Sequence, residues 1–537
     1  MSDSGISRRH FFYGTLLAGA VPAGGFGSTP SLKALGYKSP NEKLNIAAIG
    51  AGGQAAGDIN NCSSENIVAF ADVDSQRAAA TSKRFEKAAR YADFRKMLEK
   101  ESRNIDAVII AIPDHMHATA AMWSMERGKH VYVEKPLTRT VWEARQLTQA
   151  AAKYKVATQM GNQGYSSDGA RVASEIIWSG EIGNVTEVHA WTTRPIWPQG
   201  MTEIPPPQPV PPNLDWDLWL GIAKQRPFTA GGQAYNKSES ATTVSGTVSL
   251  GRNGFYHPFN WRGFFDFGCG PLGDMACHIL GAVNMALLLG APKSVEVIKQ
   301  EGKSSFAFPK KSVTVFEFPA RKNMAPVKIY WYDAATGPMY RPQGIPESEP
   351  LVGGPGAFGR QPARPGAPAG AGGGAPAGAQ RPGGPGGPGR LAGGAPGAPG
   401  GRGTPGGQSG AARPGGGFGA REGVVFVGDK GFLTTDTYGA NARLLPEARH
   451  KEYKLPPELL TRSPGHFRDW IRACKGGEPA CSNFSVAGPF TEWIVMGVIA
   501  LHFEGKLEWD SARMRFANNK EANKYIKPTF RKGWSFT

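Results

Sequence analysis

Cysteine is scarce in this sequence. The chain has 537 residues and five cysteines: Cys62, Cys269, Cys277, Cys474 and Cys481. No two of them form a Cys-x-x-Cys pair, which excludes a zinc ribbon and a thioredoxin-type motif. An odd count leaves at least one thiol unpaired. Cys474 and Cys481 could form a disulfide in an oxidising compartment, although burial as small apolar residues is the simpler expectation.

The sequence also lacks a convincing membrane span and any dense run of basic residues. Its formal net charge is +17, but the lysines and arginines are scattered along the chain. A nucleic-acid-binding protein gathers such residues on one face or stripe. Part of the excess comes from residues 353–420, which contain arginine but no Asp, Glu or Lys. We therefore expect neither a nucleic-acid partner nor a stable membrane span.

The N-terminus has the order of features of an export signal. Arg8 and Arg9 precede two phenylalanines, a short apolar stretch from Leu16 to Val21, and small residues that could form a cleavage region. This order resembles a twin-arginine signal, and the apolar stretch is too short to span a bilayer. A disordered basic tail is the alternative. We expect export to the periplasm of a protein that has already folded.

A glycine-rich loop follows the first predicted strand, Leu44–Ile49. Gly50, Gly52 and Ala55 form the pattern Gly-x-Gly-x-x-Ala, and Gly53 lies within the same loop. The first glycine permits a tight turn, the second lets the backbone approach a pyrophosphate, and the small third residue lets the helix pack on the strand. The helix N-terminus then offers unpaired N–H groups to the phosphates. This short motif is weak evidence by itself. It predicts a dinucleotide site only where a strand precedes it, a helix follows it and a second strand ends in an acidic residue.

The second predicted strand supplies that context. This strand, residues 67–71, is followed by Asp72, which lies 22 residues after Gly50. This is close to the spacing at which a carboxylate binds the 2′-hydroxyl of an adenine ribose. The same carboxylate repels a 2′-phosphate, so NAD is favoured over NADP. Strand and helix patterns alternate up to Tyr154, which predicts a doubly wound α/β domain.

Two further segments identify a family resemblance. Residues 106–117 read DAVIIAIPDHMH, and residues 130–137 read HVYVEKPL. With the glycine loop they resemble the glucose–fructose oxidoreductase and inositol dehydrogenase superfamily, the Gfo/Idh/MocA type. Residues 216–221 and 273–278 resemble an exported branch of it. The resemblance covers residues 43–340 and 421–537, and the last residues, 531–534, recur in this branch without an evident physical role.

The resemblance implies a fold and a set of site residues. It implies an N-terminal Rossmann domain with a parallel sheet, joined to an α/β domain with a mainly antiparallel open sheet. It places Pro113, His117, Glu134 and Lys135 at the nicotinamide end of the cofactor. The chemistry agrees, because ligands bind beyond the carboxyl ends of such strands.

The second domain is expected to complete the site with Asp274 and His278. Their spacing of four places both side chains on one face of a helix, and it matches the family's catalytic pair. Histidine can act as general base on a hydroxyl. Many relatives place an acid shortly after this histidine, where this chain has Gly281, so the role of that acid does not transfer. His115 and His117 lack further metal ligands nearby, so we expect no metal.

Other residues are candidates for binding the substrate. Trp261 could stack on a sugar ring, and Arg262 could donate to hydroxyl groups. Core packing is the alternative for these side chains. The predicted substrate contacts are Asn162, Gln163, His257, Trp261 and Arg262.

Composition and resemblance together divide the chain into segments. Residues 346–420 are rich in glycine and proline and lack apolar periodicity, so we expect a disordered insertion. The predicted boundaries are 1–34 for the signal, 35–42 for a spacer, 43–163 for the NAD-binding domain, 164–345 and 421–537 for the two parts of the substrate domain, and 346–420 for the insertion.

The sequence therefore predicts an NAD-dependent oxidoreductase that acts on a secondary hydroxyl of a sugar, glycoside or polyol, and that forms a homo-oligomer. Two alternatives stay open. Some relatives use transient oxidation by bound NAD to cleave a glycosidic bond. The chain could instead be a non-catalytic sugar- or partner-binding protein with a vestigial cofactor site. The sequence names neither the sugar nor the oxidised carbon.

Overall fold

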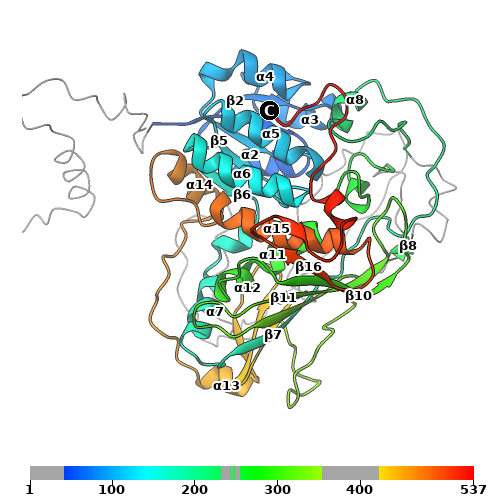
Figure 1. Cartoon of the computed structure of the whole chain (residues 1–537). Helices are drawn as coiled ribbons and strands as arrows, with labels where there is room; N and C mark the ends of the chain where they lie inside the picture. Colours follow the sequence, from blue (N-terminus) through cyan, green and yellow to red (C-terminus); the bar gives the residue numbers. More distant parts are fainter. Residues whose placement is uncertain (1–41, 231–241, 244–245, 248–253, 354–421) are drawn as a thin grey trace, which may run out of the picture.

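The computed structural model describes residues 42–230, 242–243, 246–247, 254–353 and 422–537 (Figure 1). The predicted signal at 1–34, the spacer up to residue 41 and most of the predicted insertion lie outside these residues.

The N-terminal domain is built on a parallel sheet of six described strands in the order β3-β2-β1-β4-β5-β6. Residues such as Ala107–Ile110 are buried without interruption, because helices cover both faces of a parallel sheet. The strands are β1 (Asn45–Ile49), β2 (Asn66–Ala71), β3 (Ala89–Tyr91), β4 (Ala107–Ile110), β5 (His130–Val133) and β6 (Thr158–Met160). The helices are α2 (Gln54–Asn61), α3 (Ser75–Arg84), α4 (Phe94–Lys100), α5 (Asp114–Glu126) and α6 (Val141–Tyr154).

The second domain is built on a mixed sheet of nine described strands in the order β15-β14-β13-β7-β12-β11-β10-β16-β17. Strands β7 and β12 pair in parallel, and the other neighbours pair antiparallel. The strands are β7 (Val185–Trp191), β10 (Ser294–Glu301), β11 (Lys311–Phe318), β12 (Val327–Tyr332), β13 (Gly423–Gly428), β14 (Gly431–Asp436), β15 (Arg443–Leu445), β16 (Leu507–Asp510) and β17 (Arg515–Phe516). A separate short pair is formed by β8 (Thr242–Thr243) and β9 (Gly246–Thr247). The predicted α/β fold with its two kinds of sheet is confirmed.

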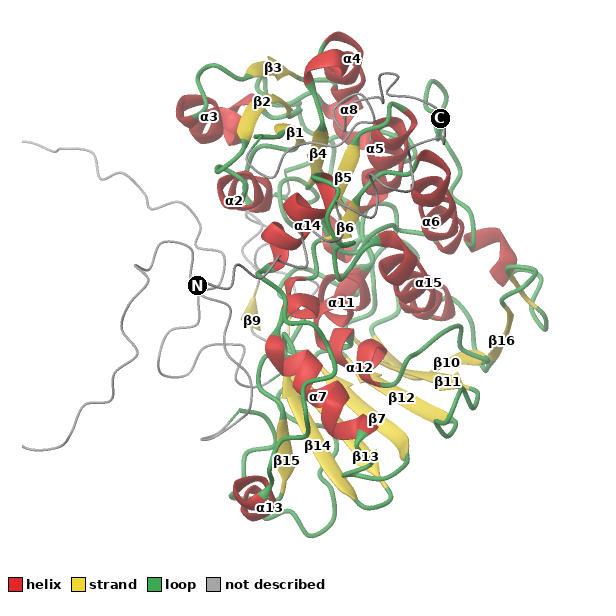
Figure 2. Cartoon of the chain, turned by 90° about the vertical axis from the view of Figure 1, so that its left-hand side faces the viewer, coloured by secondary structure: helices red, strands yellow, loops and turns green. Residues whose placement is uncertain are grey.

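Helices α11, α12 and α15 lie between the two sheets, as both ribbon views show (Figure 2). Helix α15 packs along α6, and Arg145 donates to both carboxylate oxygens of Glu492 at 2.6 Å. The helical elements are η2 (Gln163–Ser166), α7 (Asp168–Trp178), α8 (Trp216–Leu220), η4 (Asn260–Gly263), η5 (Leu272–Ala276), α11 (Cys277–Ile279), α12 (Gly281–Ala286), α13 (Glu447–Glu452), α14 (His466–Cys474), α15 (Phe484–Ala500) and η7 (Ala522–Tyr525).

The end of the chain returns to the N-terminal domain, although the sequence assigns it to the second domain. Trp470 of α14 packs 5.7 Å from the Tyr132 ring of β5.

The C-terminal motif, residues 531–534, has a structural role that the sequence did not reveal. Arg531 donates to the Gly221 carbonyl at 2.9 Å, at the end of α8, and Trp534 lies 6.3 Å from Phe94 of α4.

The start of the predicted insertion is part of the folded domain. Leu351 and Val352 are buried beside Val425 of β13, and Glu349 forms an ion pair with buried Arg443 at 3.0 Å. The expected boundary at residue 346 therefore lies too early. The sequence misplaced it because the residues before 353 share the proline content of the segment that follows.

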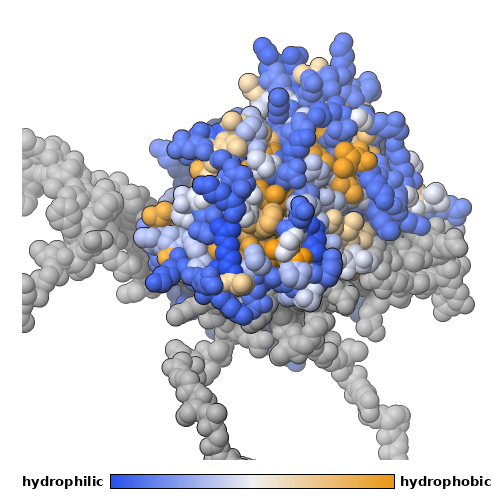
Figure 3. Space-filling model, turned by 90° about the horizontal axis from the view of Figure 1, so that it is seen from below, coloured by the Kyte–Doolittle hydropathy of each residue, from blue (hydrophilic) through white to orange (hydrophobic). Residues whose placement is uncertain are grey.

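Seen from below, the described surface is largely hydrophilic, and hydrophobic residues gather in its middle (Figure 3). No helix in the described part of the chain is long and apolar enough to cross a membrane. All five cysteines are free thiols, so Cys474 and Cys481 do not bridge.

Candidate active site

The glycine loop between β1 and α2 packs so closely on its neighbours that larger side chains would collide with them. Gly50 has a φ of +91°, and a Cβ there would collide with the Ala111 carbonyl. A Cβ at Gly52 would lie 2.9 Å from Arg77. Helix α2 begins after Gly53 with no side-chain cap, so its first N–H groups are available to an anion. The loop therefore fits a pyrophosphate.

Asp72 lies at the carboxyl end of β2, as predicted. Its Oδ2 accepts a hydrogen bond from Ala51 N at 2.8 Å, which ties the carboxylate to the glycine loop, and burial raises its pKa. The carboxylate borders a pocket of about 500 Å³ whose far wall comes from the second domain, including Pro212, Asn213 and Trp216. Asp72 thus faces the space expected for the adenosine half of a dinucleotide.

The sequence predicted His257 as a substrate contact, but this residue lies at the adenosine end of the cleft. Its Nε2 is 2.8 Å from Oδ2 of Asp74, the residue that caps α3. Asn213 donates to the other oxygen of Asp74 at 2.8 Å. The predicted role of His257 as a sugar contact is therefore wrong. The sequence could not show this, because 183 residues separate the two partners.

The strand ends of the N-terminal domain form the opposite end of the cleft. Pro113 is half-buried at the start of α5. His117 is buried, with one ring nitrogen 2.7 Å from the Pro136 carbonyl and the other 2.7 Å from the Ile112 carbonyl. Burial lowers the pKa of His117 to about 4, so the neutral ring donates to one of these two carbonyls and lies between two strand ends.

Glu134 is buried at the end of β5, as the sequence places it. Its Oε1 has no hydrogen-bond partner among the described residues. Burial raises its pKa to about 7, against the charges of Lys135 and Arg262. A Cβ at Gly161 would lie 2.5 Å from Oε1. Glycine at 161 therefore makes room for this carboxyl group.

Lys135 and Asp274 meet across the cleft from opposite domains. Lys135 Nζ donates to Asp274 Oδ1 at 2.7 Å and to the Asp274 carbonyl at 3.1 Å. Burial alone would lower the pKa of Lys135, but Asp274 and then Glu134 raise it. Conversely, burial would raise the pKa of Asp274, but Lys135 and the neighbouring arginines hold it below its usual value. Both groups are therefore charged.

The helix that carries Asp274 differs from the predicted α-helix. Residues Leu272–Ala276 form a π-helix turn, and α11 continues from Cys277. Such turns occur often at functional sites. Asp274 and His278 lie on this one helical segment, as the spacing predicted.

His278 is buried beside the lysine. Its Nδ1 has no partner among the described residues. Burial, and then the charge of Lys135, lower its pKa to about 3, so the imidazole is neutral and its protonated form is disfavoured without a bound reactant. The ring of Tyr438 lies 5.1 Å away in an edge-on contact.

Two arginines of the second domain surround Asp274. Arg262 Nε lies 3.4 Å from Oδ1, and Arg194 Nε lies 3.5 Å from Oδ2. Trp261 is buried in an aromatic cluster, and the Arg262 guanidinium covers its ring at 4.1 Å. The predicted stacking of a sugar on Trp261 is therefore wrong, whereas Arg262 does reach the site.

Asn162 and Gln163 lie at the start of η2, beside α11. Asn162 is buried, and its Nδ2 donates to the Cys277 carbonyl at 3.3 Å. Its Oδ1 has no partner in the described part of the chain. Gln163 is half-buried and lies next to it.

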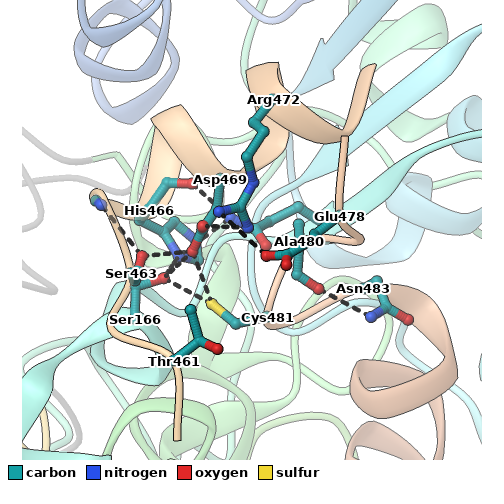
Figure 4. Close-up of polar contacts among 12 residues, drawn as sticks. Ser166, Thr461, Ser463, His466, Asp469, Arg472, Glu478, Ala480, Cys481 and Asn483 are labelled. Carbon is teal, nitrogen blue, oxygen red and sulfur yellow. Dashed lines mark hydrogen bonds and ion pairs between the residues drawn. The ribbon is translucent and has the colours of Figure 1, made fainter. Parts of the chain in front are cut away.

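A network of polar contacts connects Ser166 of η2 to residues 463–481 and holds η2 in place (Figure 4). Ser166 Oγ lies 2.8 Å from His466 Nδ1 and 2.9 Å from Cys481 Sγ. The Cys481 thiol donates to Asp469 at 3.1 Å, and Ser463 donates to the same oxygen at 2.5 Å. Burial raises the pKa of Cys481 to about 11, so this thiol serves as a hydrogen-bond donor and not as a nucleophile.

Gly281 has a structural explanation. A Cβ there would lie 3.3 Å from the Tyr165 ring. Tyr165 accepts a hydrogen bond from Asn284 at 3.0 Å. A side chain at 281 would therefore require the tyrosine ring to shift by a few tenths of an ångström.

Sequence reasoning missed Arg194 and Tyr438. Arg194 follows β7, and Tyr438 lies between β14 and β15, where 46% of the residue is exposed. Neither lies in a motif. A position just beyond a strand end was the one signal available for Arg194.

Comparison with known proteins agrees with this architecture. Residues 44–162 match the oxidoreductase family with an NAD-binding Rossmann fold. Levoglucosan dehydrogenase of Pseudarthrobacter phenanthrenivorans is 28% identical over 24% of this chain and 33% of its own. Inositol 2-dehydrogenase 1 of Paenarthrobacter aurescens is 29% identical over 30% of this chain and 48% of its own. The chain thus spans between a third and a half of the length of these relatives.

Similarity in structure extends further. The WlbA dehydrogenase of Bordetella pertussis, solved with NADH and UDP-GlcNAcA, has a TM-score of 0.50 at 12% identity, over 87% of this chain and 99% of its own. This likeness shows a shared two-domain fold. The N-terminal domain has an NAD-binding Rossmann fold, and the match of residues 44–162 to the oxidoreductase family model supports the Gfo/Idh/MocA resemblance.

Proposed function

We propose that this protein is an NAD-dependent oxidoreductase that transfers a hydride between a secondary hydroxyl carbon of a sugar, glycoside or polyol and the nicotinamide ring. The observation that carries the proposal is the contact between Lys135 of the NAD-binding domain and Asp274 of the second domain, with His278 on the same helical segment. The glycine loop fits the pyrophosphate, and Asp72 faces the adenosine pocket. When bound, NAD⁺ supplies the hydride acceptor.

The residues of the cleft divide the remaining work. Lys135 donates a hydrogen bond to the reacting oxygen and stabilises the negative charge that develops on it. His278, neutral and without a partner at Nδ1, takes the hydroxyl proton. Asp274 positions the Lys135 ammonium and offsets the charge that His278 gains.

The purified full chain tests the proposal directly. Mass spectrometry of the native protein should detect a bound dinucleotide, and a panel of inositols, hexoses and methyl glycosides should yield one class that changes NADH absorbance. Release of the aglycone without net NADH would favour the redox glycosidase. Bound NAD with no absorbance change on any sugar would favour a binding protein and contradict the proposal.

We further propose export by the twin-arginine route and assembly as a homo-oligomer. The support for export is Arg8 and Arg9 ahead of the short apolar stretch, which lies outside the described residues. Changing both arginines to lysine should keep the protein in the cytoplasm, and unchanged periplasmic recovery would contradict export. A mass measurement in solution tests the oligomer.

A further inference from the structure

The cleft holds more positive charge than proton and hydride transfer require. Three cationic side chains, Lys135, Arg194 and Arg262, lie within 3.5 Å of one carboxylate, that of Asp274. One carboxylate offsets one of these charges. Of these three residues, only Lys135 has a role in the proposed reaction. The presence of the two arginines therefore needs another explanation.

The other acids near this cluster form no ion pair with its three cations among the described residues. Burial raises the pKa of Glu134 and of Asp114 to about 7, so each is partly protonated at neutral pH. Glu422 is buried, and its Oε1 is held by hydrogen bonds from Thr192 Oγ1 at 2.7 Å and from Thr193 N at 2.8 Å, not by an ion pair with either arginine. Among the described residues, Asp274 is therefore the one carboxylate that forms ion pairs with these three cations.

Arg194 in particular has donors to spare. Its Nε is buried without a hydrogen-bond partner, and no described residue accepts from its terminal nitrogens. Its backbone is fixed, because Arg194 N donates to Thr192 Oγ1 at 3.2 Å and Ala334 N donates to the Arg194 carbonyl at 2.6 Å. About a fifth of the side chain is exposed, at 22%. A fixed guanidinium with free donors is suited to bidentate recognition of a carboxylate.

Arg262 lies on the other side of the same carboxylate. Its guanidinium is held over the Trp261 and Phe259 rings at 4.1 and 4.8 Å, and it donates to the Phe259 carbonyl at 3.2 Å. This packing fixes the plane of the guanidinium and leaves 21% of the side chain exposed. The two arginines thus approach the reaction centre from different sides.

We propose that Arg194 and Arg262 form a carboxylate-binding subsite beside Lys135 and His278, and that the substrate is a sugar acid of the uronic type. This inference rests on the proposed function. The substrate carboxylate pairs with Arg194, its neighbouring hydroxyl groups reach Arg262, and the hydroxyl whose carbon gives up the hydride lies at Lys135 and His278. No chemistry is added to the proposed reaction, because the carboxylate is unchanged.

Matched pairs of probes test the subsite. The NAD-loaded full chain is assayed with methyl glucuronide against methyl glucoside, and with methyl galacturonide against methyl galactoside. We expect kcat/KM to favour the acid of at least one pair by about 10-fold or more, the scale of a hydrogen bond to a charged group. Equal or better turnover of the neutral sugar in every pair that reacts would overturn the subsite and leave the proposed function standing.

Variants separate recognition from positioning. Arg194→Gln should raise KM for the acid by about 10- to 100-fold and leave its kcat within a few-fold, with a smaller change in KM for the neutral partner. Arg194→Lys should recover part of the loss. Arg513→Gln, at an arginine whose side chain is 71% exposed, is the matched control. An equal fall in kcat for both sugars would assign Arg194 to positioning Asp274 and overturn the proposal.

Binding is measured as well, so that failure of catalysis does not decide the question. Calorimetric titration of glucuronate and galacturonate into the NAD-loaded protein should give heat that Arg194→Gln abolishes. Absence of binding by every uronate would overturn the subsite. Uronate binding without any NAD reduction, on acids and neutral sugars alike, would support the subsite and contradict the oxidoreductase.

Discussion

The two ends of the cleft between the domains satisfy their polar groups in opposite ways. At the adenosine end, Asp72 and Asp74 accept hydrogen bonds from backbone N–H groups and from Asn213, and His257 lies against Asp74. At the nicotinamide end, several buried atoms have no partner among the described residues: Glu134 Oε1, Asn162 Oδ1, Arg194 Nε and His278 Nδ1.

Buried polar groups are normally hydrogen-bonded, so a cluster of exceptions needs a cause. The protein itself completes the adenosine end, which orders the walls around a cofactor. The nicotinamide end leaves donors and acceptors that a bound cofactor or substrate can complete. Binding and chemistry are therefore separated along one cleft, and substitutions at the two ends should have different consequences.

The largest effect is expected from the two proton-handling groups. Lys135→Ala and His278→Ala should each lower turnover by about 10²- to 10⁴-fold, the usual cost of losing a positioned proton-transfer group. Steady-state kinetics on the identified substrate measures this. NAD affinity should survive His278→Ala, because the residue comes from the second domain. The double variant should be little worse than the poorer single one, and near-normal turnover of His278→Ala would remove the proposed base.

Stability should respond more at the nicotinamide end than at the adenosine end. Asp274→Asn leaves three cations without their shared carboxylate, and breaking such a buried pair costs roughly 3 kcal/mol. His257→Ala removes one hydrogen bond to Asp74, which keeps Asn213, and should cost about 1 kcal/mol. Denaturant unfolding measures both. Equal losses would show that the two ends are built alike.

A smaller effect is expected on the choice of cofactor. Asp72→Ser removes the carboxylate that repels a 2′-phosphate, so the ratio of NADP to NAD affinity should rise by about 10-fold, or roughly 1.4 kcal/mol. Titration with each cofactor measures the ratio, and Asp74→Asn is a neighbouring control. Equal affinity of the unmutated protein for NAD and NADP would contradict a role for Asp72.

The sequence predicted the N-terminal half of the site better than the second. Lys135, Glu134 and Asp72 follow buried strands, and the end of a parallel strand determines where a side chain lies. Asp274 and His278 were identified through the family resemblance, supported by their helical spacing, although a π-helix turn carries Asp274. These residues depend on local periodicity, which a sequence displays directly.

Contacts between segments that are distant in the chain could not be predicted from the sequence. The contact of His257 with Asp74 and the packing of Arg262 on Trp261 depend on how the second domain folds against the first. Arg194 lies in no motif, and its meaning comes from Asp274, 80 positions away in sequence. Side chains of irregular segments carry no periodic signal, so only the folded chain shows which of them share a site.

The smallest expected effect concerns pH and again separates the two ends. Burial raises the pKa of Glu134 to about 7, so its carboxyl group is charged above that pH and protonated below it. A charged Glu134 attracts the positive nicotinamide ring of NAD⁺, whereas the ring of NADH is neutral. The affinity for NAD⁺ should therefore fall by about 3- to 10-fold between about pH 8 and about pH 6, with little change for NADH.

Glu134→Gln should flatten the NAD⁺ profile, because the amide does not titrate in this range. Asp114, whose pKa burial also raises to about 7, is the matched control, since Asp114→Asn should leave most of the dependence in place. Parallel profiles for NAD⁺ and NADH would show instead that the pH dependence arises at the adenosine end, where both cofactors are identical.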